Sequence, residues 1–429
     1  MAVVVAIVTT VVLGIPIALA LDRNARGPIL VGLAYLYGTG LIYVVELALA
    51  LIGVHWTALN VNAVTITIAA ICFFARKPQS LVLSPQPWLS WPDLATLLTI
   101  YAHLTWATIA RVWKWDFWAI WGMKARTFYE FGTIDWRFLE SQWNGYVHPD
   151  YPLLLPMNYL YTALVGGEWN DRWLGLITIA FGVALLLIIR GLAAMETRPV
   201  MAATITFACA LFAFTRFIGL AEGPMLAFAG AGLLFVRRAI VFDDDAAMRH
   251  GALLLGLATA SKNEGVALLV TVVAAVALSK WRLLARLWPV FVLAAAWIII
   301  PALHHIRNDQ TRGNFVARVF HRLGAFPQIA AMLLHFLAFR WMWLAVLVAL
   351  LIVPRQLRAR ERFVLLAFAF QIAGYVIIYC GTPYSVEWEI ESSWPRLTFH
   401  LATPLLYVTM LMLAQTYDSG HAEARSEQH

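Results

Sequence analysis

The densest concentration of residues that could do chemistry lies between Arg111 and Tyr151, where acidic, basic and aromatic side chains mix as they do nowhere else in the chain. Asp116 stands directly after an apolar stretch and beside a group of tryptophans. A carboxylate at an apolar boundary is costly unless it has a partner or a function. An aromatic belt at a membrane surface would account for the tryptophans, but not for Asp116. Asp116 is therefore the first candidate for a functional residue.

Two basic residues follow Asp116 on a predicted helix over 116–130. Asp116 and Lys124 lie two turns apart, broadly on the same face of that helix. We expect a juxtamembrane helix that turns Lys124 or Arg126 towards a phosphate or towards the acid. The alternative is that these long side chains only reach for lipid headgroups.

A second polar motif, with His148 and Asp150, comes just before the next apolar run. Pro149 and Pro152 hold the backbone extended and favour the start of a helix. We expect His148 and Asp150 to face the membrane surface beside that helix. The alternative is a rigid helix start whose polar residues are incidental.

A third motif interrupts the apolar hairpin 251–279 with Lys262, Asn263 and Glu264. Ionisable residues within membrane segments are functional candidates by default. The alternative is a hairpin tip in water that needs only a turn.

Two later polar segments are less specific. The first holds His304, His305, Arg307 and Arg312; adjacent histidines point in different directions on a helix, so we expect an interface or a phosphate contact rather than a metal site. The second holds Glu387, Glu389 and Glu391, which would lie on one side of an extended segment. These glutamates could bind an acceptor or a cation, but a solvated loop is the favoured interpretation.

The elements that must position these residues are membrane helices. The chain has 429 residues, of which 62% are hydrophobic and 13% charged, and a mean hydropathy of +0.74. A span needs about 20 apolar residues, and this rule predicts an all-α, polytopic helical membrane protein with roughly 11–13 crossings. The net charge of +7 could suggest a nucleic-acid partner. The basic residues sit in short connectors, as in cytoplasmic loops, so no nucleic-acid partner is expected.

The charge bias also predicts topology. Basic connectors at 75–92, 237–249, 280–286 and 355–362 belong inside. All five polar segments (111–153, 216–222, 262–264, 304–312 and 387–396) then fall on the external side. One region resists this assignment: either 154–167 dips into the membrane without crossing it, or the charge rule fails there.

Four regions are predicted: N-terminal transmembrane helices and a linker (1–92), a transmembrane core with the first external loop 111–153 (93–355), C-terminal transmembrane helices (356–416) and a polar tail (417–429). The short loops and the lack of a soluble domain favour a prokaryotic inner (cytoplasmic) membrane.

The motifs resemble those of the GT-C superfamily of membrane glycosyltransferases, which includes protein O-mannosyltransferases and lipid A aminoarabinose transferases. The resemblance covers about 90–355. Its matching residues are Trp115–Trp121, Lys124–Arg126, His148–Pro152, the small-residue helix Gly256–Gly265 and the polar stretch Arg216–Glu222. The family often has paired acids in the first loop, whereas Asp116 stands without an acidic neighbour.

The resemblance implies transfer of a sugar from a polyprenyl-phosphate donor to a hydroxyl of a lipid, glycan or protein acceptor on the external face. Asp116 would act as general base. Cations would stabilise the leaving phosphate. The substrate-binding or phosphate-binding set would be Lys124, Arg126, His148, Asp150, Glu222, Lys262, Asn263, Glu264, Arg307 and Arg312. A divalent cation, Mg²⁺ or Mn²⁺ with Asp116 as a ligand, is implied by the family alone.

Two other classes stay open. A lipid or lipid-linked-sugar transporter would be expected to show broken helices, midplane charges and repeated halves. A non-catalytic membrane subunit related to the transferases would fit the isolated position of Asp116.

Overall fold

The structure is a computed structural model that describes residues 1–75, 90–110, 114–214, 218–306, 308 and 313–426, with side chains to Asp418. Within these residues every element is a helix. The N-terminal helices are α1 (Ala2–Leu21), α2 (Gly27–Leu51) and α3 (Ala58–Ala75). Helices α1 and α2 approach so closely that a Cβ atom added to Gly14 would lie 1.8 Å from the Ala34 carbonyl oxygen. Small residues at such contacts are typical of membrane helix pairs.

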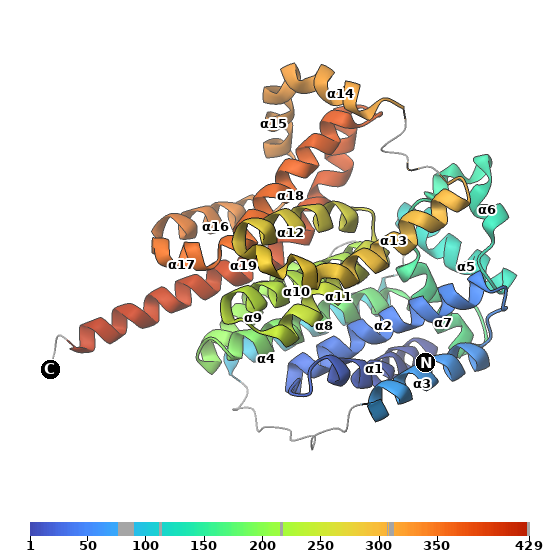
Figure 1. Ribbon diagram of the computed structural model, residues 1–429, viewed down its shortest axis with the longest axis horizontal. Helices are drawn as coiled ribbons and strands as arrows, with labels where there is room; N and C mark the ends of the chain where they lie inside the picture. Colours follow the sequence, from blue (N-terminus) through green and yellow to red (C-terminus); the bar gives the residue numbers. More distant parts are fainter. Residues whose placement is uncertain (76–89, 111–113, 215–217, 307, 309–312, 427–429) are drawn as a thin grey trace.

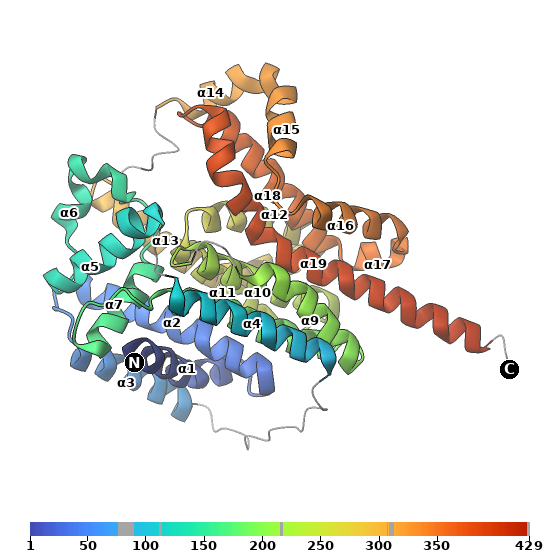
Figure 2. The same cartoon turned by 180° about the vertical axis from the view of Figure 1, so that it is seen from behind.

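The middle of the chain supplies most of the bundle that Figures 1 and 2 show. Its longer helices are α4 (Trp91–Ile109), α7 (Leu154–Gly166), α8 (Gly175–Ala194), α9 (Pro199–Ala213), α10 (Glu222–Phe242), α11 (Asp245–Ser261), α12 (Glu264–Lys280) and α13 (Trp288–Leu303). A short 3₁₀ helix, η3 (Trp281–Leu287), joins α12 to α13. Helix α2 packs against α7 and α8, and α10 packs against α11. The N-terminal helices are thus part of one core.

Between α4 and α7 the chain forms short elements: the π-helix η1 (Phe117–Trp121), then α5 (Gly122–Phe131), α6 (Trp136–Glu140) and the 3₁₀ helix η2 (Gln142–Val147). The predicted helix over 116–130 is therefore present as η1 and α5.

The C-terminal part contains α14 (Phe315–Arg322), η4 (Leu323–Ala325), α15 (Phe326–His335), α16 (Arg340–Ile352), α17 (Arg355–Arg360), α18 (Arg362–Gly381) and α19 (Val386–Ser426). Helices α14 and α15 project from the bundle, and the end of α19 extends away from it on another side (Figures 1 and 2).

The described residues contain eight helices that are long and apolar enough to cross a membrane, or nine if the bent pair Phe315–His335 and Arg340–Ile352 forms one span. The all-α, polytopic architecture is confirmed, but this number is below the roughly 11–13 crossings expected from the ~20-residue rule. Helices α4, α7, α9 and α11 are not among the eight, and Glu264–Leu303, which contains α12, η3 and α13, is counted as one. Helix α7 has 13 residues and at 1.5 Å per residue covers ~20 Å, less than the ~30 Å hydrocarbon core.

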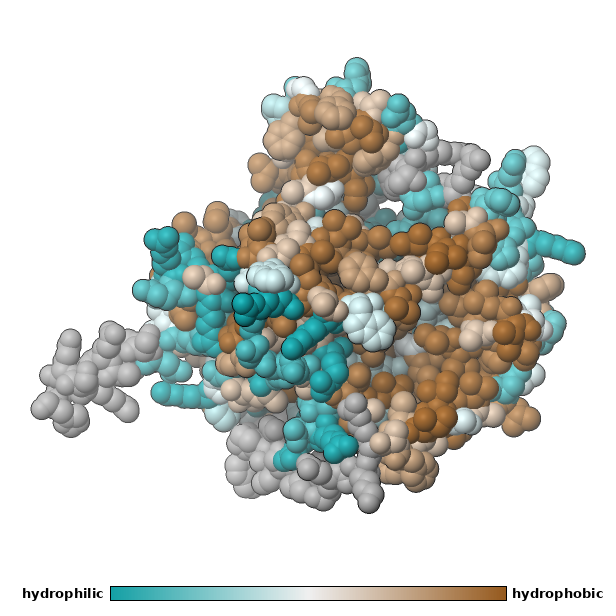
Figure 3. Space-filling model, in the orientation of Figure 1, coloured by the Kyte–Doolittle hydropathy of each residue, from teal (hydrophilic) through white to brown (hydrophobic). Residues whose placement is uncertain are grey.

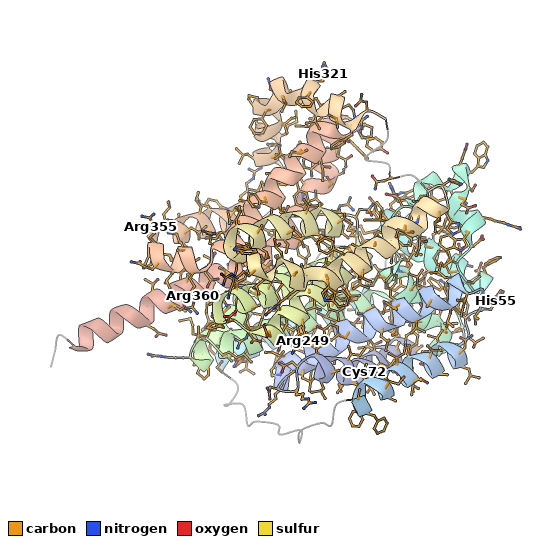
Figure 4. The ribbon with its side chains drawn as sticks, viewed as in Figure 1. His55, Cys72, Arg249, His321, Arg355 and Arg360 are labelled. Atoms are coloured by element: carbon orange, nitrogen blue, oxygen red, sulfur yellow. The ribbon has the colours of Figure 1, made fainter. Side chains whose placement is uncertain are left out.

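The two ends of the bundle differ in the residues they carry. Arg355 and Arg360 lie at one end, and His55 lies at the opposite end (Figure 4). The helices α5 and α6 share the end of His55 (Figure 1). Figure 3 shows broad apolar surface over the helices, with hydrophilic surface at the end of Arg355 and Arg360, across the lower centre and at the opposite edge.

Candidate functional site

Five charged side chains from four separate parts of the chain meet in one cluster, the Asp116 cluster: Asp116, Glu222, Lys262, Glu264 and Arg396. Arg396 Nη1 donates to Asp116 Oδ2 at 2.5 Å and lies 3.5 Å from Glu222 Oε1. Lys262 Nζ donates to Glu264 Oε1 at 2.7 Å and to Glu222 Oε1 at 3.2 Å. Four predicted residues are thus brought together, joined by Arg396, which the sequence analysis missed.

Local backbone structure explains how each acid reaches the cluster. Asp116 precedes the π-helix η1, and π-helical turns inside helices are frequent at functional sites. Glu222 and Glu264 are the first residues of α10 and α12, where the helix dipole favours a carboxylate. The break between α11 and α12 is sharp because of Gly265, where an added Cβ atom would lie 2.3 Å from the Ala258 carbonyl oxygen.

Burial divides the cluster into a floor and an open side. The side chains of Glu222 and Lys262 are buried, whereas those of Asp116 and Arg396 are 29% and 22% exposed. Burial lowers the pKa of Lys262, but Glu222 and Glu264 outweigh it, so the pKa is raised and the ammonium stays charged. The exposed pair is therefore the part of the cluster that a molecule from outside can reach.

The floor of the cluster is not fully hydrogen-bonded. Glu222 Oε2 and both ring nitrogens of His400 are buried without a hydrogen-bond partner among the described residues. His400 lies one turn after Arg396 on α19 and is close enough to interact electrostatically with Glu222 and Lys262. Buried polar atoms without partners are uncommon in folded proteins and mark positions that need an explanation.

A second group of contacts surrounds Asp150 and is linked to the Asp116 cluster through Asn263. The carboxylate Oδ2 accepts from Asn263 Nδ2 and Asn308 Nδ2, both at 2.8 Å. The backbone oxygen of Asp150 accepts from Trp297 Nε1 at 2.9 Å. Asn263 lies between Lys262 and Glu264, so Asp150 fixes the turn that carries two members of the Asp116 cluster.

Lys124 has a different role from the predicted phosphate contact. Its side chain is buried, and its ammonium donates to the backbone oxygens of His148, at 2.6 Å, and Tyr151, at 3.4 Å. Burial lowers the pKa of Lys124 to about 7, and Asp150 only partly opposes this. The Lys124 ammonium holds the 148–151 turn instead of facing outwards, and it contacts neither Asp116 nor the open side of the cluster. The His148 ring stacks on Tyr151 at 4.7 Å.

The remaining predicted residues lie elsewhere or outside the described part. Arg126 is exposed on α5 and pairs with Glu130 at 2.8 Å. Arg307 and Arg312 lie outside the described residues. His304 stacks on Trp136 at 3.7 Å and its Nδ1 lies 2.7 Å from Glu140 Oε1; the interface or phosphate contact expected for it stays a prediction.

The prediction of an extended loop carrying three glutamates is wrong. Glu387, Glu389 and Glu391 belong to the first turns of α19. On a helix, residues two apart do not share a face, so the glutamates do not form the row predicted for an extended segment.

Arg396 and His400 were missed because Arg396 was placed at the end of the external polar segment 387–396 and His400 in the apolar stretch after it. In the structure α19 begins ten residues earlier than Arg396, at Val386. The available signal was the i, i+4 spacing of Arg396 and His400, which places both on one face of a continuous helix.

The carboxylates of the Asp116 cluster face cationic side chains in the described part of the chain. The described residues contain no group of three or more His, Cys, Asp or Glu side chains that could hold one. The carboxylates of Asp116, Glu222 and Glu264 are instead bound by Arg396 and Lys262. Mg²⁺ or Mn²⁺ stays a prediction from the family resemblance alone.

Comparisons with protein-family models, with curated proteins and with solved structures found no match.

Proposed function

We propose that this chain is a membrane glycosyltransferase that transfers a sugar from a polyprenyl-phosphate donor to an acceptor hydroxyl on the external side of the membrane. The observation that carries the proposal is the Asp116–Arg396 pair. A carboxylate and a guanidinium lie 2.5 Å apart, both partly exposed, above a buried charged floor. The motif resemblance to the GT-C superfamily supports the same class.

Asp116 suits the acceptor hydroxyl of such a reaction, and Arg396 suits the leaving phosphate. The acceptor oxygen forms a bond to the anomeric carbon while the bond from that carbon to the phosphate oxygen breaks. Asp116 takes the proton of the acceptor hydroxyl as general base. The polyprenyl phosphate leaves with the bonding electron pair, and the planar guanidinium of Arg396 binds its oxygens.

The rest of the cluster positions Arg396. Glu222 lies 3.5 Å from the guanidinium and is itself held by Lys262. When a donor phosphate binds Arg396, the Asp116 carboxylate is released to face the acceptor. A buried, charged support of this kind keeps a catalytic group oriented without reorganisation during the reaction.

The test is sugar transfer by purified protein from a polyprenyl-phosphate sugar, with Asp116→Asn as the variant. Loss of a general base typically lowers the rate about 10²–10⁴-fold. Glu130→Gln is the matched control, because Glu130 is an exposed carboxylate near Asp116 in sequence but outside the cluster. Unchanged transfer by Asp116→Asn would remove its assignment as base. If the unmodified protein transfers sugar from no donor, the transporter and the non-catalytic subunit become the better interpretations.

A further inference from the structure

Helix α14 is amphipathic in the opposite sense to a helix on the surface of a soluble protein. Its basic side chains point inwards: Arg318 Nε donates to the Gly381 backbone oxygen, and Arg322 Nη1 donates to the Thr382 backbone oxygen, both at 2.6 Å. These oxygens lie at the C-terminal end of α18, where backbone carbonyls lack helical partners and attract cations. The arginines thus fix α14 across the end of α18.

The opposite face of α14 is apolar and exposed. Phe320 is 68% exposed, and Val316, Leu323 and Phe326 are exposed beside it; α14 itself has no buried residue. We call these four residues the α14 patch. A soluble protein seldom leaves a run of large apolar side chains uncovered, so such a patch marks a surface that contacts something apolar.

The chain that follows indicates what covers the patch. Helix α16 exposes Trp341, Leu344, Leu347 and Leu351 at helical spacing, as a lipid-facing helix does. Helices α14 to α16 also form the bent pair that could make a broken span. Residues 315–352 contain no Asp or Glu, so no carboxylate has to be desolvated when this segment contacts lipid.

From these observations we infer that α14 lies in the lipid–water interface of the membrane, with the α14 patch inserted among acyl chains and its arginines on the protein side. Its partner is the bilayer, not a second copy of the chain. Interfacial helices of this kind bury an apolar face several ångströms into the headgroup boundary. The inference does not depend on the proposed enzymatic function.

The experiment measures the depth of a nitroxide spin label in protein reconstituted into nanodiscs of mixed anionic and neutral phospholipids. The background is Cys72→Ser; Cys209 and Cys380 are buried, and the background without a new cysteine serves as the blank. Labels are placed by Phe320→Cys, in the patch, and by His321→Cys, the adjacent exposed position at the tip that Figure 4 labels. Leu351→Cys on α16 is the lipid reference, and the exposed Glu168→Cys is the aqueous reference.

The expected result is a ratio of oxygen to nickel-chelate accessibility at Phe320→Cys that approaches the Leu351→Cys value and exceeds that of His321→Cys. A ratio at Phe320→Cys equal to the aqueous reference would overturn the inference. Low accessibility to both reagents, with spin–spin broadening that disappears on dilution with unlabelled protein, would overturn it in favour of self-association. Each variant is first compared with the parent protein by thermal unfolding, so a misfolded label site is recognised before its depth is interpreted.

Discussion

Helix α10 carries a buried charge near each end, and the two surroundings differ sharply. Near its C-terminal end, Arg237 donates to both oxygens of Glu196 and to both oxygens of Glu361, at 2.5–2.9 Å. All three side chains are at least 97% buried, and we call them the Arg237 cluster. At its first residue, Glu222 belongs to the Asp116 cluster, which is partly exposed and leaves polar atoms without partners.

The contrast separates two uses of charge in one membrane protein. In the Arg237 cluster one guanidinium satisfies two carboxylates in paired geometry, which is the arrangement that makes a buried ion pair tolerable. It joins the 195–198 turn, α10 and the start of α18, and every oxygen of the two glutamates accepts a hydrogen bond from Arg237. The Asp116 cluster has surplus acceptors and an open side. A closed cluster suits structure, and an open one suits binding.

The largest effect is expected in the closed cluster. Arg237→Met would strip two buried carboxylates of all four hydrogen bonds from Arg237 and leave only Arg360, 3.8 Å from Glu196, as a cation. Breaking a buried pair in this way typically costs about 3–5 kcal/mol. The free energy of unfolding in detergent micelles is the measurement. Any loss of transfer should follow the loss of folded protein and disappear when rates are normalised to it.

The control for this prediction removes the stranded charges as well. Adding Glu196→Gln and Glu361→Gln to Arg237→Met should recover part of the lost stability, because no unpaired charge stays buried. A single Arg237→Met variant within about 1 kcal/mol of the parent protein would contradict the closed-cluster interpretation.

In the Asp116 cluster a substitution should lower sugar transfer more than it lowers stability. Arg396→Gln is expected to lower transfer about 100-fold, equivalent to ~2.7 kcal/mol in the transition state, while changing stability less than Arg237→Met does. Glu222 keeps Lys262 as a partner in this variant, so no buried acid is left alone. Steady-state kinetics with varied donor would show the loss. Arg396→Lys keeps the charge without the planar fork and should recover only part of the activity. A stability loss as large as that of Arg237→Met, with normal activity per folded molecule, would make the two clusters equivalent.

Two buried lysines provide a finer comparison. Lys262 is held by two glutamates and stays charged, whereas Lys124 donates to backbone oxygens and its pKa is lowered to about 7. The unfolded chain keeps that proton up to a pKa of about 10.4. Between these values the unfolded state binds more protons than the native state, so stability rises with pH. The expected gain between pH 7 and pH 8 is about 1 kcal/mol. Lys124→Met should remove this gain, which unfolding at both pH values would detect. An identical pH dependence in parent protein and variant would show that Lys124 stays charged.

The sequence predicted what local patterns can carry. Apolar runs indicated most helices, and the isolated polar residues Asp116, Glu222, Lys262 and Glu264 were each recognised as candidates. Their ion pairs join residues far apart in the chain: Asp116 and Arg396 are 280 positions apart. No spacing rule predicts such a contact, because it depends on how the helices are packed.

Depth was the other quantity that the sequence did not provide. Helical periodicity places Lys124 on a face of α5, but only the packed structure shows that this face is covered by the 148–151 turn. For the same reason the sequence did not indicate the position of Arg396. It follows Pro395 and was taken as the end of a loop, whereas α19 continues through Pro395 and Pro404.

The smallest effect is expected for a cation that belongs to neither cluster. Arg126 was a candidate phosphate ligand, but it pairs with Glu130 on the exposed face of α5, with both side chains more than half exposed. Exposed i, i+4 pairs contribute about 0.3–0.5 kcal/mol, so Arg126→Ala should change unfolding by no more than that. Transfer should stay within about twofold of the parent rate, because twofold corresponds to only ~0.4 kcal/mol in the barrier. The matched variant is Arg396→Ala, which removes the same kind of side chain from the Asp116 cluster. If Arg126→Ala lowered transfer as much as Arg396→Ala, phosphate recognition would extend over the surface of α5, and the open cluster would be only one part of a larger site.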